Sequence, residues 1–238
     1  MKISKDKKLC EEYIGKHPVI SISLKGINAA SYEAAFELTV KTIKGAVQKA
    51  GFLKMSDKLD EDEKKEYRAI LDENMSEATL FWSLKNLSEL LEKHYETKVI
   101  LLIDEYDVPL AKAFENGYYD KMVFLIRNLL EQTLKTNNSL KFAVMTGCMR
   151  ISKESIFTGL NNLKVLSITD ERFDEYFGFT DEDVKEMLRY HDREDHYEEM
   201  RNWYDGYRFG STDVYCPWDV LNHVNALQDN PDTEPKSY

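Results

Sequence analysis

The segment Val99–Asp107, with the sequence VILLIDEYD, decides the fold class of this 238-residue chain. Five large aliphatic residues are followed directly by Asp104 and Glu105, with Asp107 two residues further on. A short run that is apolar at every position is typical of a parallel strand buried on both faces. Ligands of such sheets bind beyond the carboxyl ends of the strands, where these acids stand. The segment therefore predicts an α/β fold with a functional site at this strand end.

Three further apolar runs predict strands of the same sheet: Pro18–Leu24, Phe142–Thr146 and Val165–Ile168. Between the runs, apolar residues recur three and four positions apart, as on one face of a helix. These faces are Phe36, Val40, Ile43 and Val47 (with Ser31 as the N-cap), then Leu80, Leu84, Leu87 and Leu91, then Met122, Leu125 and Leu129. The alternation predicts one parallel sheet of four strands, covered by helices on both faces.

Residues 1–171 are predicted to form this core, and residues 172–238 a small helical appendage without strands. Thr180 and Asp183 form a capping-box pattern that starts a helix reaching to about Tyr190, and Pro217 begins another. The charge-dense stretch Asp57–Asn74 predicts an exposed helix or a flexible insertion.

The composition excludes several classes of protein. A net charge of −11 and a pI near 5.1 disfavour direct nucleic-acid binding, which needs clustered Lys and Arg. Three widely spaced cysteines make neither a disulfide framework nor a zinc site. Val99–Ile103 is the longest apolar run, far too short to cross a membrane, and the charged N-terminus does not resemble a signal peptide. We expect a cytoplasmic protein with no membrane partner; nothing in the sequence indicates its oligomeric state.

Asp104 and Glu105 match the order of two catalytic acids in P-loop ATPases. In those enzymes an Asp at a strand end holds Mg²⁺, usually through water, and a following Glu polarises the attacking water. Asp104 would then be the magnesium-linked acid and Glu105 the catalytic acid. The plain alternative is a strand that ends at a solvated acidic turn.

The run Phe142–Thr146 ends in a similar way, with Gly147 and Arg150 following Thr146. Thr146 would be a polar sensor of the γ-phosphate, and Arg150 would neutralise phosphate charge. The alternative is a threonine at an ordinary strand end and an arginine paired with Glu154 one helical turn on. If both strand ends belong to one site, Asp104 and Thr146 lie close together at the carboxyl edge of the sheet.

A phosphate-binding loop of the form GxxxxGK[ST] does not occur in the sequence. Gly15–Lys16 and Lys44–Gly45 are the nearest candidates, and neither follows a strand or precedes a Ser or Thr. Without that loop, backbone N–H groups and a lysine are missing around the phosphates. We therefore expect ATP with Mg²⁺ to bind weakly or not at all to these residues alone.

Several segments together resemble the predicted AAA-ATPase family, also called AAA-ATPase-like, which is common in bacterial genomes. They cover most of the chain from Lys16 to Val224 and read HPVISISLKG, VILLIDEYDVPLAKAFENGYYDKM, MTGCMRISKESIFTGLNNLKV, EYFGFTDEDVKEML and WYDGYRFGSTDVYCPWDVLNHV. The resemblance implies a P-loop NTPase-like fold, a helical segment and often a C-terminal PD-(D/E)XK nuclease-like domain. By motif, Asp104, Glu105 and Thr146 resemble the magnesium-linked acid, the catalytic acid and the sensor.

The chain departs from the family pattern at both ends. The RRFGKT-type phosphate loop and its strand would precede Met1, and the nuclease-like domain would follow Tyr238. The usual strand order 5-1-4-3-2 then implies a sheet lacking its first (Walker A) strand, with an empty slot between the strands from Phe142 and Val165.

The resemblance implies the core of an ATPase whose cofactors are ATP and Mg²⁺ and which is inactive without its phosphate loop. Two alternatives stay open. One is a non-catalytic remnant or protein-interaction module, and the other is part of a nucleic-acid-processing ATPase–nuclease protein.

Overall fold

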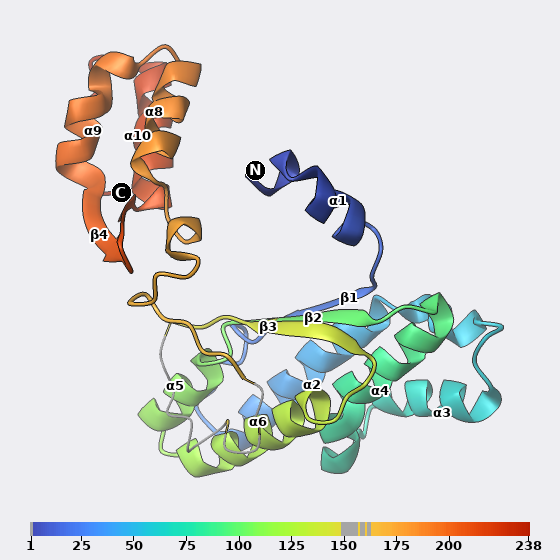
Figure 1. Cartoon of the computed structure of the whole chain (residues 1–238). Coiled ribbons are helices and arrows are strands. Elements are labelled where there is room, and N and C mark those ends of the chain that lie inside the picture. The colour runs from blue at the N-terminus through green and yellow to red at the C-terminus, as the bar shows by residue number, and fades with distance from the viewer. Residues whose placement is uncertain (1, 149–156, 158–159, 161–162) are drawn as a thin grey trace. The chain divides into compact units, whose positions relative to one another are not determined.

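The computed structural model describes residues 2–148, 157, 160 and 163–238, which form two compact units. Met1–Leu163 is the N-terminal unit and Lys164–Tyr238 the C-terminal unit, and each has its own hydrophobic core. The chain divides between residues 163 and 164, whereas the sequence predicted a boundary after residue 171. Figure 1 shows the elements of both units.

Among the described residues, the sheet of the N-terminal unit contains three parallel strands in the order β1-β2-β3. They are β1 (Val19–Ser23), β2 (Val99–Asp104) and β3 (Leu140–Met145). Three of the four predicted strands are thus confirmed, within two residues at each end. Helices connect them, as the right-handed crossover of parallel strands requires.

Long helices cover one face of the sheet (Figure 1). They are α2 (Tyr32–Gln48), α4 (Glu77–Tyr95) and α6 (Tyr119–Leu134). The predicted helix faces are confirmed, because Ile43, Leu84 and Leu125 are fully buried. Ser31 caps α2 by accepting a hydrogen bond from the backbone N–H of Ala34 at 3.3 Å. The remaining helices in the described part of the unit are η1 (Lys2–Lys5), α1 (Lys7–Tyr13), η2 (Gly51–Met55), α3 (Glu61–Ile70) and α5 (Val108–Glu115).

The charge-dense stretch is a helix that joins the core. In α3, Tyr67 and Ile70 are fully buried, and the Tyr67 hydroxyl donates to the Val47 carbonyl at 2.9 Å. The helical alternative for this stretch is therefore confirmed, with its charged residues on the outer face.

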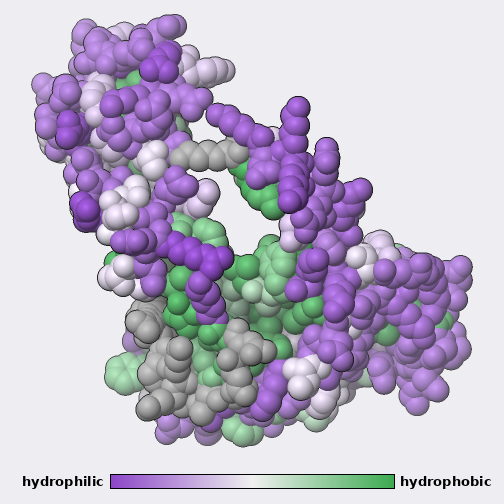
Figure 2. Space-filling view, viewed as in Figure 1, coloured by the Kyte–Doolittle hydropathy of each residue, from purple (hydrophilic) through white to green (hydrophobic). Residues whose placement is uncertain are grey.

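On the opposite face of the sheet, the described residues of the N-terminal unit provide only α1, so the expected cover of helices on both faces is not found within this unit. Side chains of Val19, Leu102, Phe142 and Val144 are exposed there. Figure 2 shows hydrophobic residues gathered over this part of the sheet. From α1, the Tyr13 ring meets the Phe142 ring at 6.1 Å, yet α1 buries none of its own residues. An apolar run in the sequence shows which side chains a strand carries. It does not show whether a helix packs on them.

The fourth predicted strand, Val165–Ile168, is not a strand. These residues are irregular and belong to the C-terminal unit, where the Ile168 carbonyl accepts from the backbone N–H of Gly210 at 2.7 Å. Four apolar residues are too few to separate a strand from a packed loop. The slot expected between two strands is therefore not formed, and β3 is an edge strand within the described residues.

The C-terminal unit combines helices with a β-hairpin that the sequence analysis missed. Its helices are η3 (Asp174–Tyr176), α8 (Asp181–Tyr190), η4 (Glu194–His196), α9 (Tyr197–Tyr204) and α10 (Pro217–Asp229). The predicted starts of α8 and α10 are confirmed, with both hydrogen bonds of the Thr180–Asp183 capping box present. The hairpin pairs β4 (Asp205–Phe209) with β5 (Thr212–Tyr215), and Gly210 in its turn has a φ of +50°.

Candidate active site

The carboxyl ends of the three parallel strands lie side by side. The register pairs Ser23 of β1 with Asp104 of β2, and Ile103 of β2 with Met145 of β3. Thr146, the next residue, is fixed by its backbone N–H, which donates to the Ile103 carbonyl at 2.9 Å. Its hydroxyl donates to the Asp104 carboxylate. The expected closeness of Asp104 and Thr146 is confirmed.

Glu105 turns away from that pair towards β1. Its Oε2 accepts from the Ser23 hydroxyl at 3.4 Å, and its Oε1 lies 3.9 Å from the Lys25 ammonium. The backbone of Glu105 has a φ of +54°, in the left-handed region that costs a residue with a side chain about 1–2 kcal/mol. Neighbouring contacts, such as the Leu24 N–H bond to the Asp104 carbonyl at 2.9 Å, hold this turn in place.

Ser23 and Lys25 are site residues that the sequence analysis did not identify. Both stand at the end of the run Pro18–Leu24, so they occupy the same place on β1 as Asp104 on β2 and Thr146 on β3. A polar residue directly after a predicted strand was the sequence signal that could have identified them. The prediction used this signal for β2 and β3 and not for β1.

The loops after β2 and β3 are packed tightly at Gly147. A Cβ atom there would lie 2.7 Å from Asp107 Oδ1 and 2.8 Å from Tyr106 Cε1, closer than real contacts allow. Glycine is therefore required for the two loops to meet. Asp107 is buried and precedes α5, and the Tyr106 ring packs against Phe157 with centroids 5.5 Å apart. These contacts keep the strand ends in a fixed arrangement.

Arg150 lies outside the described residues, and so do Lys153 and Glu154. The expected contact of Arg150 with phosphate, and its alternative pairing with Glu154, both stay predictions.

The oxygen atoms at the strand ends fit a magnesium ion held largely through water. Asp104 supplies a carboxylate, and Ser23 and Thr146 supply hydroxyls, all of them hard oxygen donors. Within the described part of the chain, no three His, Cys, Asp or Glu side chains gather as a protein-only metal cage. Mg²⁺ usually keeps several waters and takes other ligands from substrate phosphates, so one carboxylate here suits its chemistry.

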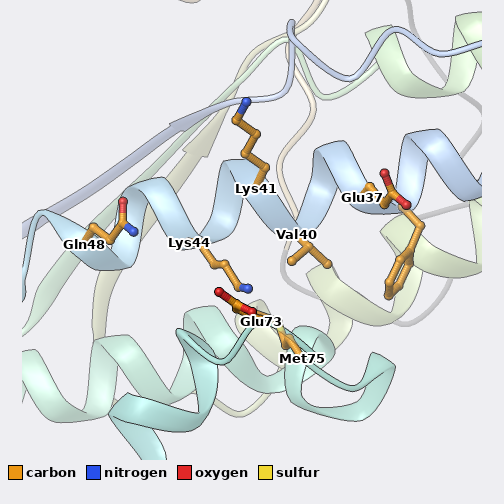
Figure 3. Close-up of a pocket in the computed structure, with 8 residues that line it drawn as sticks. Glu37, Val40, Lys41, Lys44, Gln48, Glu73 and Met75 are labelled. Carbon is orange, nitrogen blue, oxygen red and sulfur yellow. The ribbon is translucent and has the colours of Figure 1, made fainter.

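A pocket among the described residues lies elsewhere on the N-terminal unit. It measures about 490 Å³ and lies between α2 and the segment around Glu73 and Met75. Figure 3 shows Lys44 of α2 directed towards Glu73 across it. None of the strand-end residues lines it, so the strand-end chemistry has no part in this pocket.

Comparison with known proteins identifies the family of the chain. The model of the AAA-ATPase-like family, described as a predicted AAA-ATPase, matches residues 2–157. The chain belongs to the AAA-ATPase-like family. The match includes all three parallel strands and every strand-end residue named above, and it ends before the C-terminal unit begins.

A relative from Azotobacter chroococcum mcd 1, an uncharacterized protein in the vnfD 5′ region, is 32% identical over 137 residues. The aligned part is 52% of this chain and 24% of the relative, so the chain spans about a quarter of that longer protein. No solved structure matches the chain. Of the helices that the structure describes, none has the length and apolar character needed to cross a membrane.

Proposed function

We propose that the strand ends of the N-terminal unit are the magnesium and water half of an ATP-hydrolysing site. The observation that carries this proposal is the hydrogen bond from Thr146 to Asp104, with Glu105 as the adjacent residue. An acid that binds the metal, a second acid and a polar residue on the neighbouring strand are the parts that P-loop ATPases place at this edge. Membership of the AAA-ATPase-like family supports the same assignment.

Each residue has a definite task in this proposal. Asp104 holds Mg²⁺ through water, and Thr146 orients the Asp104 carboxylate and senses the γ-phosphate. Bound Mg²⁺ would neutralise the charge that develops on the phosphates. Glu105 accepts a proton from the attacking water, and Arg150 neutralises phosphate charge.

Ser23 and Lys25 position Glu105 in this proposal. In the present arrangement they hold its carboxylate over β1, with Oε1 3.9 Å from the lysine ammonium.

The phosphate loop has to come from a polypeptide segment outside these 238 residues, because the sequence contains no GxxxxGK[ST]. Calorimetry of the 238-residue chain should therefore give a Kd for ATP–Mg²⁺ no tighter than about 1 mM, equivalent to roughly −4 kcal/mol. Micromolar binding would contradict this expectation, and would mean that other residues of this chain bind the phosphates.

Hydrolysis is to be tested in a longer form of the protein that carries a phosphate loop. Glu105→Gln should lower turnover at least a hundredfold and leave ATP binding unchanged, because only proton transfer is lost. Asp104→Asn should weaken the magnesium-dependent part of binding. The matched control is Asp120→Asn, an acid on α6 outside the site, which should behave as wild type. Wild-type turnover in Glu105→Gln would remove Glu105 from catalysis.

A second function, a non-catalytic interaction module, is favoured by one observation, the lack of a phosphate loop in this sequence. If a longer form that carries a phosphate loop neither binds nor hydrolyses ATP, this second function is supported and the strand ends serve the fold and not catalysis.

A further inference from the structure

The net charge of the protein belongs entirely to the C-terminal unit. Residues 1–163 contain 24 Lys and Arg and 24 Asp and Glu, so their formal charges cancel. Residues 164–238 contain 8 Lys and Arg and 19 Asp and Glu, which leaves −11 on 75 residues. A field of this size attracts positively charged partners and repels nucleic acid.

One loop of this unit places aromatic side chains among the acids. It is Glu171–Phe177, with the sequence ERFDEYF, and we name it the aromatic–acidic loop. Phe173 is exposed, as are Tyr176 at 60% and Phe177 at 69% of their surfaces. The hairpin residue Tyr207 is exposed in the same unit. The rings of Phe173 and Tyr176 lie 6.1 Å apart, and apolar rings that remain exposed to water side by side typically mark an interaction surface.

The loop is held in a fixed shape by the hairpin turn. Asp174 Oδ2 accepts from the backbone N–H of Ser211 at 3.1 Å and from its hydroxyl at 3.3 Å. A Cβ atom at Gly210 would lie 2.7 Å from the Glu171 Cα, so the turn and the loop are in direct contact. Beyond the loop, Phe179 pairs with Tyr215 of β5. A partner would therefore meet a loop whose backbone is already held in place, which lowers the entropy cost of binding.

The chemistry of the loop suits guanidinium and ammonium groups. Arg172 lies with its guanidinium 4.7 Å from the centre of the Phe173 ring, so a cation already stacks on one ring of the loop. Cations stack on aromatic faces and pair with carboxylates, and arginine does both better than lysine. Tyr176 and Phe177 present further faces beside Glu171 and Glu175.

We propose that the aromatic–acidic loop is a docking site for an arginine- and lysine-rich polypeptide segment. Carboxylates of Glu171 and Glu175 attract the segment, and the rings of Tyr176 and Phe177 stack on its side chains. The rings distinguish this site from the rest of the acidic surface, since charge alone would accept any cation equally.

Fluorescence anisotropy of the full 238-residue chain tests the proposal with three labelled peptides, in which Arg, Lys or Glu alternates with Gly. The Arg peptide should bind, the Lys peptide should bind more weakly, and the Glu peptide should not bind. Tyr176→Ala and Phe177→Ala should each weaken binding of the Arg peptide about fivefold, the range expected for one cation–π contact. Tyr190→Ala is the matched control, because Tyr190 is 82% exposed in the same unit but outside the loop.

A second pair of variants separates the loop from bulk charge. The double variant Glu171→Gln/Glu175→Gln should weaken binding of the Arg peptide clearly more than the double variant Asp229→Asn/Asp232→Asn. The second variant removes the same charge elsewhere in the unit. Equal losses in both pairs, together with wild-type binding by the ring variants, would overturn the proposal in favour of non-specific attraction. An absence of binding by the Arg peptide to the wild-type chain would also overturn the proposal. If Phe177→Ala lowers the melting temperature without weakening the peptide, the loop packs against the protein itself, which also overturns the proposal.

Discussion

The two units differ in what holds them together and in what they offer to partners. The N-terminal unit has balanced charge, a large core of long helices against a parallel sheet, and polar residues at the carboxyl ends of its strands. The C-terminal unit carries −11, and its small core includes Val184, Leu188, Met200 and Val224. The two proposals made above accordingly assign catalysis to the first unit and recognition to the second.

The largest expected effect tests whether the units are independent. Leu84 is fully buried in α4, so Leu84→Ala should lower the free energy of unfolding of the N-terminal unit by about 2–5 kcal/mol. The transition of the C-terminal unit should not move. Tryptophan fluorescence separates the two, because Trp82 reports on the first unit, and Trp203 and Trp218 report on the second.

Leu188→Ala, which removes an equally buried leucine from α8, is the reciprocal control and should affect only the C-terminal unit. Transitions that shift together in either variant would mean that the units unfold as one, and the comparison between them would fail.

Much of the fold of the two units could be predicted from the sequence. Apolar residues at helical spacing, such as Leu80 to Leu91, defined the long helices, and the buried run at Val99 defined the central strand and its acids. Thr180 and Pro217 marked helix starts correctly. The hairpin was missed because β4 is exposed along most of its length, so DGYRF has no alternating apolar face. Ser23 and Lys25 also stand at the end of a predicted strand, but the sequence did not show that both would contact Glu105.

A pH dependence should distinguish the C-terminal unit. His223 of α10 is fully buried, its Nε2 has no hydrogen-bond partner among the described residues, and burial lowers its pKa below the ordinary 6.5. The unfolded chain therefore binds a proton below about pH 6.5 while the folded unit stays neutral. The C-terminal unit should have its full stability above that pH. Below it, the free energy of unfolding should fall by up to about 1.4 kcal/mol per pH unit.

Urea unfolding of the C-terminal unit at pH 7.5 and pH 5.5 measures this loss. His223→Gln should flatten the dependence, and His191→Gln, at a partly exposed histidine of the same unit, should leave it unchanged. A dependence that survives in His223→Gln would place the responsible proton elsewhere.

A smaller effect is expected at the strand ends of the N-terminal unit. Thr146→Val keeps the shape of the side chain and removes the hydroxyl that donates to Asp104. Because the pair is exposed to water, the unfolding free energy should fall by only about 1 kcal/mol. Thr146→Ser retains a hydroxyl and should lose less. Equal losses in both variants would show that the methyl group, and not the hydrogen bond, matters there.

The smallest expected effect has the opposite sign. Asparagine tolerates the left-handed backbone of Glu105 better than glutamate, so Glu105→Asn should raise the unfolding free energy of the N-terminal unit by about 0.5 kcal/mol. Glu66→Asn, in the regular helix α3, should lower it by a similar amount. Destabilisation by both substitutions would mean that the contacts of Glu105 with Ser23 and Lys25 outweigh its backbone strain.

The central claim is that a metal–nucleotide site lies at the carboxyl ends of β1, β2 and β3, and metal-induced broadening of backbone amide signals tests it most directly. In a titration with ATP and Mn²⁺, a paramagnetic substitute for Mg²⁺, the amides of Asp104, Glu105 and Gly147 should broaden first. Asp104→Asn should remove that selectivity. Broadening that begins among the acids of the C-terminal unit, and is unchanged in Asp104→Asn, would contradict the account, because the metal would then follow bulk charge and not the strand ends.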